Sequence, residues 1–327
     1  MTPGPTPSPA GPTPALPPLL VVAGATATGK TALALELAET IGEVEIVSAD
    51  SRQVYRGLDI GTAKPGAAER AAVPHHGLDL VDPDEPFSAA DYRRHALEAL
   101  AGIAERGRLA MLVGGTGLYL RAMARGLPLE RAGSDPDVRA RLEVRLRDDG
   151  LAALVAELHR RDPAAARAID LDNPRRVVRA LERAIVTGRG TPPEPEGYPA
   201  PVRWIGLALD RARHRAAIES RAAGQFEGGL LEEAAGLRER YRDDLAAFSA
   251  MGSREAFGVL AGQTDVATAV ARTSGRTWAY ARRQRTWFRS EPGIEWLDAG
   301  EGIARRTLGL LGPFLRGIGR PVYAGRR

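Results

Sequence analysis

Cysteine is absent from this chain and lysine is scarce. Without cysteine, the 327 residues cannot form disulfides, thiolate metal sites or thiol redox centres. Among 45 Lys and Arg residues only two are lysines, Lys30 and Lys64. A lysine ammonium is a compact point charge, whereas an arginine guanidinium is a wide planar fork. In a chain that otherwise uses arginine, each lysine is therefore a candidate for a site where a guanidinium would not serve.

Long apolar runs are also missing. No stretch approaches the roughly 18 apolar residues that a membrane-spanning helix needs. Residues 1–18 hold eight prolines and lack the basic start and apolar middle of a secretory signal. These features predict a disordered proline-rich leader over 1–18, and a cytoplasmic protein without a membrane partner.

A phosphate-binding motif surrounds the first lysine. Residues 24–31 fit the pattern G-x-x-x-x-G-K-[ST], in which backbone N–H groups and a helix N-terminus face negative oxygens. Lys30 would neutralise the terminal phosphates, and the Thr31 hydroxyl would coordinate Mg²⁺. The alternative is a glycine-rich turn before an ordinary helix. The predicted diphosphate- or triphosphate-binding residues are Gly24, Ala25, Thr26, Ala27, Thr28, Gly29, Lys30 and Thr31.

The hydrophobic pattern around this motif predicts an α/β fold. Short apolar runs at 19–23, 43–48 and 109–113 have strand character, and 31–40 continues from the motif with helical spacing. Ser88 and Asp91 form a capping-box pattern before a helix that runs to about Gly107. Strands that alternate with helices indicate a doubly wound parallel sheet of P-loop type, with ligands at the carboxyl ends of its strands.

From residue 127 onward the pattern changes to helices alone. The expected helices lie near 136–148, 151–160, 163–169 and 174–187. Strand character returns at 202–209, and helices near 211–224, 229–241 and 265–289 precede a last strand at 294–297. The predicted organisation is a leader at 1–18, a catalytic core at 19–126 and 202–315, a helical insertion at 127–201 and a tail at 316–327.

One carboxylate stands out near the phosphate motif. The strand at 109–113 ends in Gly114-Gly115-Thr116, where an ATPase normally carries an acidic residue for Mg²⁺ and water. The acid at a strand end is instead Asp50. Such a carboxylate is suited to assist Mg²⁺ or to act as a general base toward an acceptor nucleophile. Its structural alternative is an aspartate that caps the following turn.

Two further features have competing interpretations. Residues 276–289 contain five arginines and no acid, with four aromatic residues interleaved. This suits a polyanion that carries stackable bases, or a surface helix whose aromatics form its core face. His75 and His76 are adjacent on an expected loop without a third ligand at zinc spacing, which favours structural histidines.

At this point the motifs together resemble the tRNA dimethylallyltransferases, also called tRNA isopentenyltransferases. The matching segments run in family order between residue 19 and about 298, so only the leader and the tail lie outside the resemblance. The blocks at 48–55 and 59–65 are far more specific than the phosphate motif, and the second of them contains Lys64. The complete set of matching segments is 24–31, 48–55, 59–65, 113–119, 172–176 and 282–287.

The resemblance implies transfer of a dimethylallyl group from dimethylallyl diphosphate to N6 of the adenine at tRNA position 37, next to the anticodon. The phosphate loop and Mg²⁺ would then hold the leaving diphosphate rather than ATP. Asp50 matches the family's general base, and Arg221 matches an arginine near the diphosphate, where it acts with Lys30. Thr116 matches the residue at the constriction where the flipped base meets the donor. No protein partner is implied.

The resemblance also implies a set of tRNA-binding residues. These are Asp50, Ser51, Arg52, Gln53, Thr116, Arg139, Pro174, Arg175, Arg176, Val177 and Val178. The chain departs from the family at Met251-Gly252-Ser253, where Gly-Tyr is usual, so a stacking or hydrogen-bonding tyrosine is lost. Lys64 either touches the diphosphate or supports its loop.

Three other functions share parts of this pattern. The related adenylate isopentenyltransferases perform the same chemistry on free AMP, ADP or ATP. A small-molecule or nucleotide kinase is supported only by the generic phosphate loop. A nucleic-acid-binding module with a degenerate nucleotide site conflicts with intact Lys30, Thr31 and Asp50. The helical insertion and the arginine-aromatic segment are surplus for a small nucleotide, which favours tRNA.

Overall fold

The computed structural model describes residues 16–129, 133–191 and 194–320. The chain divides into two compact units. The first comprises Met1–Ala124 with Tyr198–Arg327, and we call it the core unit. The second comprises Arg125–Gly197, and we call it the insertion unit. The sequence prediction placed the insertion at 127–201.

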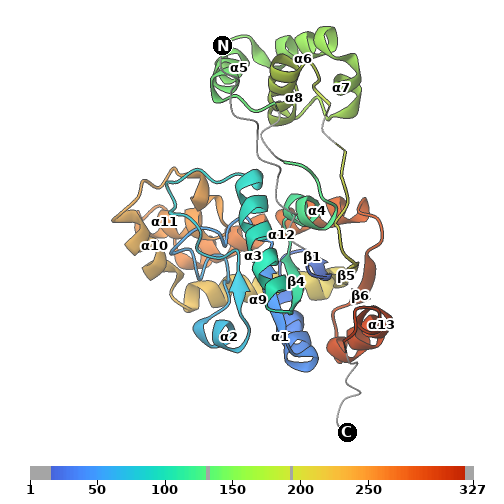
Figure 1. The fold of residues 1–327 in the computed structure, drawn as a ribbon. Helices are drawn as coiled ribbons and strands as arrows, with labels where there is room; N and C mark the ends of the chain where they lie inside the picture. The colour runs from blue at the N-terminus through green and yellow to red at the C-terminus, as the bar shows by residue number, and fades with distance from the viewer. Residues whose placement is uncertain (1–15, 130–132, 192–193, 321–327) are drawn as a thin grey trace, which may run out of the picture. The chain divides into compact units, whose positions relative to one another are not determined.

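A six-stranded parallel sheet forms the centre of the core unit (Figure 1), so the predicted α/β fold class is confirmed. The strand order is β3-β2-β4-β1-β5-β6. Every residue of β1, β2 and β4 is buried, as expected for strands that helices cover on both faces. The strands are β1 (Leu19–Gly24), β2 (Val44–Ser48), β3 (His75–His76), β4 (Leu109–Gly114), β5 (Val202–Ala208) and β6 (Glu295–Asp298).

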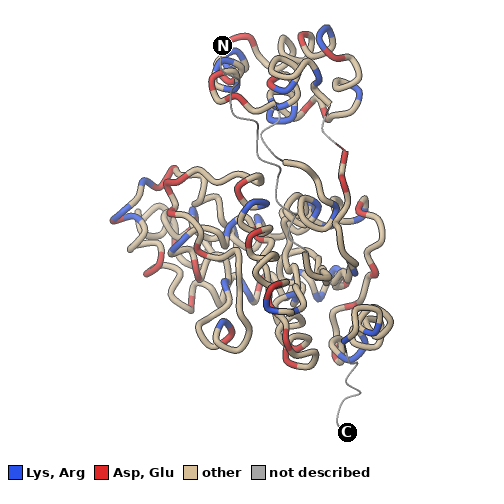
Figure 2. Tube along the Cα trace, in the orientation of Figure 1, with Lys and Arg blue, Asp and Glu red and all other residues tan. Residues whose placement is uncertain are grey.

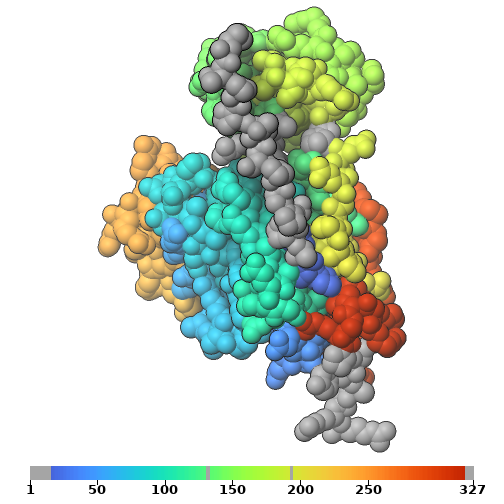
Figure 3. Space-filling view, viewed as in Figure 1, coloured from blue at the N-terminus to red at the C-terminus, as the bar shows by residue number. Residues whose placement is uncertain are grey.

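Helices cover both faces of this sheet because alternate strand residues point in opposite directions. Leu20 and Val22 pack with α1 and α13, whereas Leu19 and Val21 pack with α3, α4, α9 and α12. Helix α3 lies at the surface of the core unit (Figure 3). The helices of this unit are α1 (Lys30–Ile41), α2 (Ala67–Ala72), α3 (Ala89–Glu105), α4 (Gly117–Ala124), α9 (Arg211–Glu227), α10 (Leu230–Arg238), α11 (Ser253–Leu260), α12 (Val266–Arg289) and α13 (Ile303–Gly317), with a 3-10 turn at Ala246–Ser249.

The predicted start of α3 is confirmed in atomic detail. The Ser88 hydroxyl accepts the N–H of Asp91, and the Asp91 carboxylate accepts the N–H of Ser88. These two bonds satisfy N–H groups that the first helical turn leaves without partners. The helix ends at Glu105, two residues before the predicted glycine.

Both ends of the chain are packed further than the sequence indicated. Helix α13 was not predicted, and Arg320 beyond it donates hydrogen bonds to the carbonyls of Gly42 and Gly107. At the other end, the Tyr198 hydroxyl donates to the carbonyl of Pro17. The predicted tail and leader were therefore too long by at least residues 316–320 and 16–18. The rest of both segments, 321–327 and 1–15, lies outside the described residues.

The insertion unit is a cluster of helices around its own hydrophobic core. Three of them begin with a cap residue followed by proline, at Asp135, Asp162 and Asn173, and each cap side chain accepts a backbone N–H. Basic and acidic residues are interspersed along these helices (Figure 2). The helices are α5 (Pro136–Asp148), α6 (Gly150–Arg161), α7 (Pro163–Ala168) and α8 (Pro174–Thr187).

Across residues 16–129, 133–191 and 194–320, no helix is both long and apolar enough to cross a bilayer.

Candidate active site

The phosphate loop connects β1 to α1 and is folded back on itself. The Thr28 hydroxyl donates to the Ala25 carbonyl at 2.9 Å, and Lys30 Nζ donates to the same oxygen at 2.7 Å. Ala27 and Gly29 both have positive φ, 59° and 83°. Left-handed residues within a tight turn direct successive N–H groups toward one side, which produces an anion-binding concavity.

Lys30 is a half-buried cation whose hydrogen-bond partner is a neutral carbonyl. No carboxylate lies within ion-pair distance of its Nζ in the described part of the chain. Burial lowers the pKa of Lys30 to about 8, the Arg221 charge lowers it further, and the Asp50 charge opposes both. A half-buried ammonium held near a second cation favours binding of an anion.

Arg221 brings a guanidinium from α9 to the phosphate loop. Its Nη1 donates to the Thr26 hydroxyl at 3.2 Å, and its Nη2 donates to the Thr62 carbonyl at 3.3 Å. Burial lowers the pKa of this guanidinium, while the Asp50 charge raises it. Arg221 therefore hydrogen-bonds to both the phosphate loop and the 59–65 block, two segments that are separate in the sequence.

Asp50 and Thr116 follow β2 and β4, which are neighbours in the sheet. Asp50 Oδ1 accepts the N–H of Arg52 at 2.8 Å, as in an aspartate that caps its own turn. Asp50 Oδ2 accepts no hydrogen bond from residues that the structure describes. Thr116 Oγ1 accepts the N–H of Ser51 at 3.0 Å. One carboxylate oxygen thus orients the side chain and the other is available for chemistry.

The glycines after β4 permit this close approach of two strand ends. A Cβ on Gly114 would lie 2.2 Å from the carbonyl oxygen of Ala49, the residue that precedes Asp50. A Cβ on Gly117 would lie 2.3 Å from the ring of Trp287 on α12. The Gly-Gly-Thr-Gly block therefore allows Thr116 to lie beside the Asp50 turn while α12 packs over it.

Thr26, Asp50 and Arg221 line one cavity of about 340 Å³ in the core unit. Lys30, Thr31 and Thr116 are not among its lining residues, and Thr31 lines a separate, smaller pocket. Tyr280 from α12 forms part of its wall, and burial raises the pKa of this phenol, with a further increase from the Asp50 charge. Met251, in the segment that differs from the family pattern, also lines the cavity. Ser253, in the same segment, is buried at the start of α11. Residues that face this cavity include Thr26, Asp50, Arg221, Met251, Tyr280 and Arg283.

Lys64 has a different environment from Lys30. Its Nζ donates to the Tyr55 carbonyl and to carboxylate oxygens of Asp59 and Asp79, at 2.6, 2.8 and 2.6 Å. Only 1% of its side chain is exposed. Of the two roles predicted for this lysine, the structure favours support of the loop. Because its protons are directed to these three oxygens, Lys64 holds the 59–65 block in shape.

The remaining predicted residues are divided between surface and interior. Gln53 is buried and donates to the carbonyls of Thr62 and Ala63, so it also supports the 59–65 block. Arg52 donates to the Ala246 carbonyl. Ser51 contributes its backbone to Thr116, as described above, and its residue lines the cavity.

In the insertion unit, the predicted tRNA-binding residues do not all present side chains to solvent. Val177 and Val178 are buried in the unit's core, so their side chains stabilise α8 instead of forming a surface for RNA. Arg139 donates to the carboxylate of the fully buried Glu182. Pro174, Arg175 and Arg176 are exposed at the start of α8.

Two residues at the phosphate loop were not predicted. The Gln284 side-chain oxygen accepts the N–H of Thr26 at 2.8 Å, and His214 Nε2 lies 2.9 Å from the Thr26 carbonyl. Gln284 is in the 282–287 segment that the sequence singled out, where it is the uncharged polar residue among arginines. His214 has no comparable signal in the sequence.

The arginine-aromatic segment lies in α12, where the structure supports the core-face interpretation and polyanion binding stays a prediction. Phe288 is buried and Trp287 packs against the main core cluster, as a core face requires. Tyr280 lines the cavity, and Arg285 lies over the Trp278 ring at 5.1 Å. The helix therefore contributes aromatics to the core and both arginine and tyrosine to the site.

The adjacent histidines lie in strand β3, not on the loop that was predicted, because His75 and His76 pair with Ile46 and Val47. His76 Nε2 contacts the Glu45 carboxylate at 2.6 Å. The described residues contain no group of three or more His, Cys, Asp or Glu side chains that could hold a metal ion.

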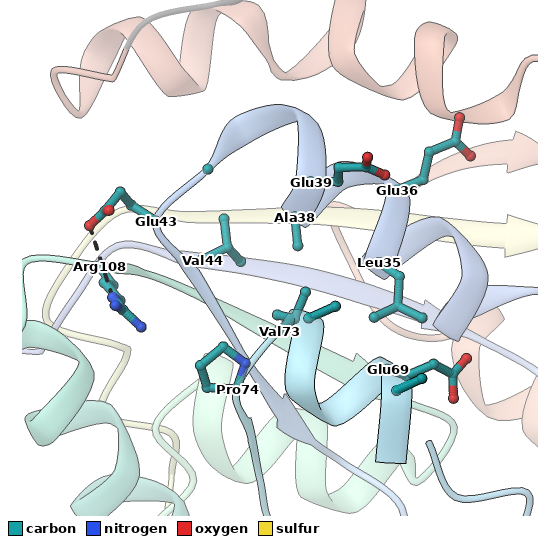
Figure 4. Close-up of a pocket in the computed structure, with 13 residues that line it drawn as sticks. Leu35, Glu36, Ala38, Glu39, Glu43, Val44, Glu69, Val73, Pro74 and Arg108 are labelled. Carbon is teal, nitrogen blue, oxygen red and sulfur yellow. Dashed lines mark ion pairs between the residues drawn. The ribbon is translucent and has the colours of Figure 1, made fainter. Parts of the chain in front are cut away.

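A second, larger pocket of about 720 Å³ lies by α1, α2 and β2 (Figure 4). Glu36, Glu39, Glu43 and Glu69 line it together with Arg108 and apolar residues. No phosphate-loop residue contributes to it. Its acidic lining would repel a diphosphate, so the smaller cavity beside Asp50 is the candidate active site.

Comparison with known proteins agrees with this geometry. Residues 53–291 match the family model described as IPP transferase. The chain belongs to the IPP transferase family. A tRNA dimethylallyltransferase from Roseiflexus sp. strain RS-1 is 48% identical to this IPP transferase chain, over 86% of this chain and 93% of the relative.

Solved structures give the same result for the fold. A full-length tRNA isopentenylpyrophosphate transferase from Bacillus halodurans superposes with a TM-score of 0.67 and 38% identity, covering 92% of this chain and 96% of that one. A eukaryotic dimethylallyltransferase acting on tRNA has a TM-score of 0.77 at 22% identity, covering 95% of this chain and 82% of that one. This second likeness concerns the fold alone. The IPP transferase fold therefore spans both units of the chain.

Proposed function

We propose that this IPP transferase moves the dimethylallyl group from dimethylallyl diphosphate to N6 of the adenine at tRNA position 37, next to the anticodon. The observation that carries the proposal is the convergence of Thr26, Arg221 and Asp50 in one cavity. Cations and loop N–H groups suit an anionic leaving group, and a carboxylate with one available oxygen suits proton removal. Family membership supports prenyl transfer to a tRNA adenine.

In the proposed reaction, N6 of adenine forms a bond to C1 of the dimethylallyl group as the bond from C1 to the diphosphate oxygen breaks. The electron pair of that bond leaves with the diphosphate. Lys30, Arg221 and N–H groups of the phosphate loop stabilise the added negative charge. The proton that N6 loses passes to Asp50 Oδ2. Thr116 holds the backbone beside Asp50, and the family resemblance assigns it to the constriction where base and donor would meet.

Mg²⁺ fits the donors available here. The Thr31 hydroxyl makes no hydrogen bond to any other residue in the described part of the chain. Mg²⁺ in phosphate sites often takes one or two protein oxygens and completes its shell with phosphate oxygens and water. We propose that Thr31 holds the ion, which neutralises charge on the diphosphate when bound.

The RNA partner is supported by surface residues of both units. Arg283 lines the cavity in the core unit, and Arg175 and Arg176 are exposed at the start of α8 in the insertion unit. Arginines of this kind contact phosphates, and Tyr280 offers an aromatic face for an extruded base. Because tRNA is the proposed substrate, we also propose a cytoplasmic location.

A labelled transfer assay tests the proposal. Dimethylallyl diphosphate with a labelled prenyl group and Mg²⁺ is incubated with an unmodified anticodon stem–loop, full tRNA, AMP or ATP in separate reactions. We expect label in the two RNA reactions only. Label on AMP or ATP would identify a free-nucleotide prenyltransferase, and absence of transfer to any acceptor would contradict prenyl transfer altogether.

A further inference from the structure

Thr26, in the middle of the phosphate loop, is held through three of its polar atoms by side chains from elsewhere in the core unit. Its N–H donates to Gln284 Oε1 at 2.8 Å, and its carbonyl lies 2.9 Å from His214 Nε2. Its hydroxyl accepts from Arg221 at 3.2 Å. The conformation of this peptide is therefore set by α9 and α12, not by the loop alone.

Gln284 makes the longest-range of these contacts and also binds a second strand end. Its Nε2 donates to the carbonyl of Gly115 at 2.9 Å, and the residue is buried. A single planar amide thus connects the loop after β1 with the turn after β4. A side-chain amide presents an acceptor and a donor side by side, whereas an ionised carboxylate only accepts and an ammonium only donates.

The backbone at Gly115 is adapted to this side chain. A Cβ at position 115 would lie 2.4 Å from Gln284 Nε2 and 3.2 Å from the Gly24 carbonyl oxygen. The absence of a side chain at Gly115 therefore admits the amide between the two strand ends. This gives the glycine a role that its neighbour Thr116 does not share.

We propose that Gln284 is a positioning residue for the diphosphate. By engaging the Thr26 N–H, it fixes the loop so that the other backbone N–H groups face the phosphate oxygens. A cradle of this kind binds anions only when its dipoles are held in place before the ligand arrives. Gln284 itself does not touch the reacting atoms and acts through Thr26.

Gln284 and its neighbour Arg283 on α12 have different surroundings. Arg283, its neighbour in sequence, lines the cavity that contains Asp50. Helix α12 therefore carries one residue that faces the cavity and the next that faces the phosphate loop. The proposal requires that these two roles be separable, since Gln284 acts on the diphosphate and not on the RNA.

The test compares Gln284→Glu and Gln284→Met with the wild-type chain. Binding of inorganic diphosphate in the presence of Mg²⁺ is measured by calorimetry, and binding of the anticodon stem–loop by fluorescence anisotropy. Loss of a buried hydrogen bond that fixes the loop should weaken diphosphate binding by about tenfold or more. We expect stem–loop affinity to stay at the wild-type value, and the KM for dimethylallyl diphosphate to rise more than the KM for RNA.

Two companion variants complete the test. Gly115→Ala should reproduce the loss of diphosphate affinity, because the added Cβ displaces the amide. Gln263→Glu, an identical chemical change at an exposed glutamine, should leave both affinities unchanged. Should Gln284→Glu fail to fold, Gln284→Met keeps the side-chain volume and removes the hydrogen bonds, so it decides the matter.

Two results would overturn the inference. The first is wild-type diphosphate affinity in a folded Gln284 variant. The second is a fall in stem–loop affinity while diphosphate binding is intact, which would make Gln284 an RNA contact. Either outcome is distinct from failure of the proposed function, since that would show as absent prenyl transfer by the wild-type chain.

Discussion

The side chain of Lys64 is buried and Lys30 is half-buried, and the two lysines have opposite roles. Lys64 directs its protons to a carbonyl and two carboxylates, and it stabilises the 59–65 block. Lys30 contacts a single carbonyl and lies near another cation, and its pKa falls to about 8. Burial alone does not explain these opposite roles. The decisive property is whether the folded chain itself supplies the counter-charge.

The phosphate loop is held in place by hydrogen bonds from side chains of other helices, and the contrast with the Lys64 region shows why. The Lys64 region is held by its own ion pairs and by Glu233, whose carboxylate accepts the N–H groups of Asp59, Ile60 and Gly61. The Lys30 region cannot be stabilised by carboxylates without losing its affinity for anions. Neutral groups, the Gln284 amide and the His214 imidazole, take that role instead.

The largest expected effect is on kcat, and it distinguishes the carboxylate that takes the proton, Asp50, from the cations that bind diphosphate. Asp50→Asn should lower kcat for prenyl transfer by about 10²–10⁴-fold, because a general base contributes that much. Diphosphate affinity should change little, since the cations that bind it remain. Single-turnover kinetics and calorimetry measure the two quantities. Asp84→Asn, at an exposed aspartate, is the control, and a normal kcat in Asp50→Asn would remove Asp50 from this role.

The next effect concerns the structural lysine. Lys64→Met should lower the free energy of unfolding by about 2 kcal/mol, because Asp59 loses its ion-pair partner and Asp79 keeps only Arg70. That figure is at the low end for buried pairs, since the side chains of Asp59 and Asp79 are 59% and 32% exposed. Denaturant titration measures the loss. Diphosphate affinity close to wild type is expected alongside it, and a folded, equally stable variant that no longer binds diphosphate would reverse the assignment.

The pH dependence of diphosphate binding should report the charge state of Lys30, the lysine without a carboxylate partner. Lys30 is charged below its pKa of about 8 and neutral above it, so it attracts diphosphate less as pH rises through that value. Affinity for dimethylallyl diphosphate should then fall by up to about tenfold per pH unit. The last ionisation of a phosphate ester has a pKa of about 6, so the charge of the ligand changes little above pH 7. A flat binding profile between pH 7 and 9.5 would contradict the assignment.

The smallest effects are expected in the insertion unit. Arg175→Gln and Arg176→Gln should each weaken tRNA binding modestly and reduce its salt slope by about one, as for a single phosphate contact. Val177→Ala should lower the melting temperature without changing RNA affinity, because its side chain is in the core of that unit. Filter binding at several salt concentrations measures the slopes. An unchanged slope in both arginine variants would place the RNA contacts elsewhere.

Local sequence signals predicted most of the fold. Apolar runs located five of the strands, and the cap residue Ser88 marked the start of α3. Helices α2, α4, α11 and α13 were not predicted. Two of them contain a residue that disfavours a helix. Gly117 begins α4, and Pro313 lies inside α13. In both cases tertiary packing overrides weak local propensity.

The residues of the candidate site were predicted only in part, and from different kinds of signal. Lys30 and Thr31 follow from a local motif, whereas roles for Thr116 and Arg221 came from family resemblance. Gln284 and His214 are separated from Thr26 by 258 and 188 residues. A contact across such a separation leaves no trace in local spacing, so only the folded chain reveals it.

The most direct test of the contrast between the two lysines is diphosphate binding and thermal unfolding of Lys30→Met and Lys30→Arg. We predict that both variants lose diphosphate binding and that Lys30→Met melts no lower than wild type, because it removes a half-buried charge that lacks a carboxylate partner. Diphosphate binding retained in Lys30→Arg would show that a guanidinium serves equally well in the loop. A large drop in the melting temperature of Lys30→Met would show that Lys30, like Lys64, is structural.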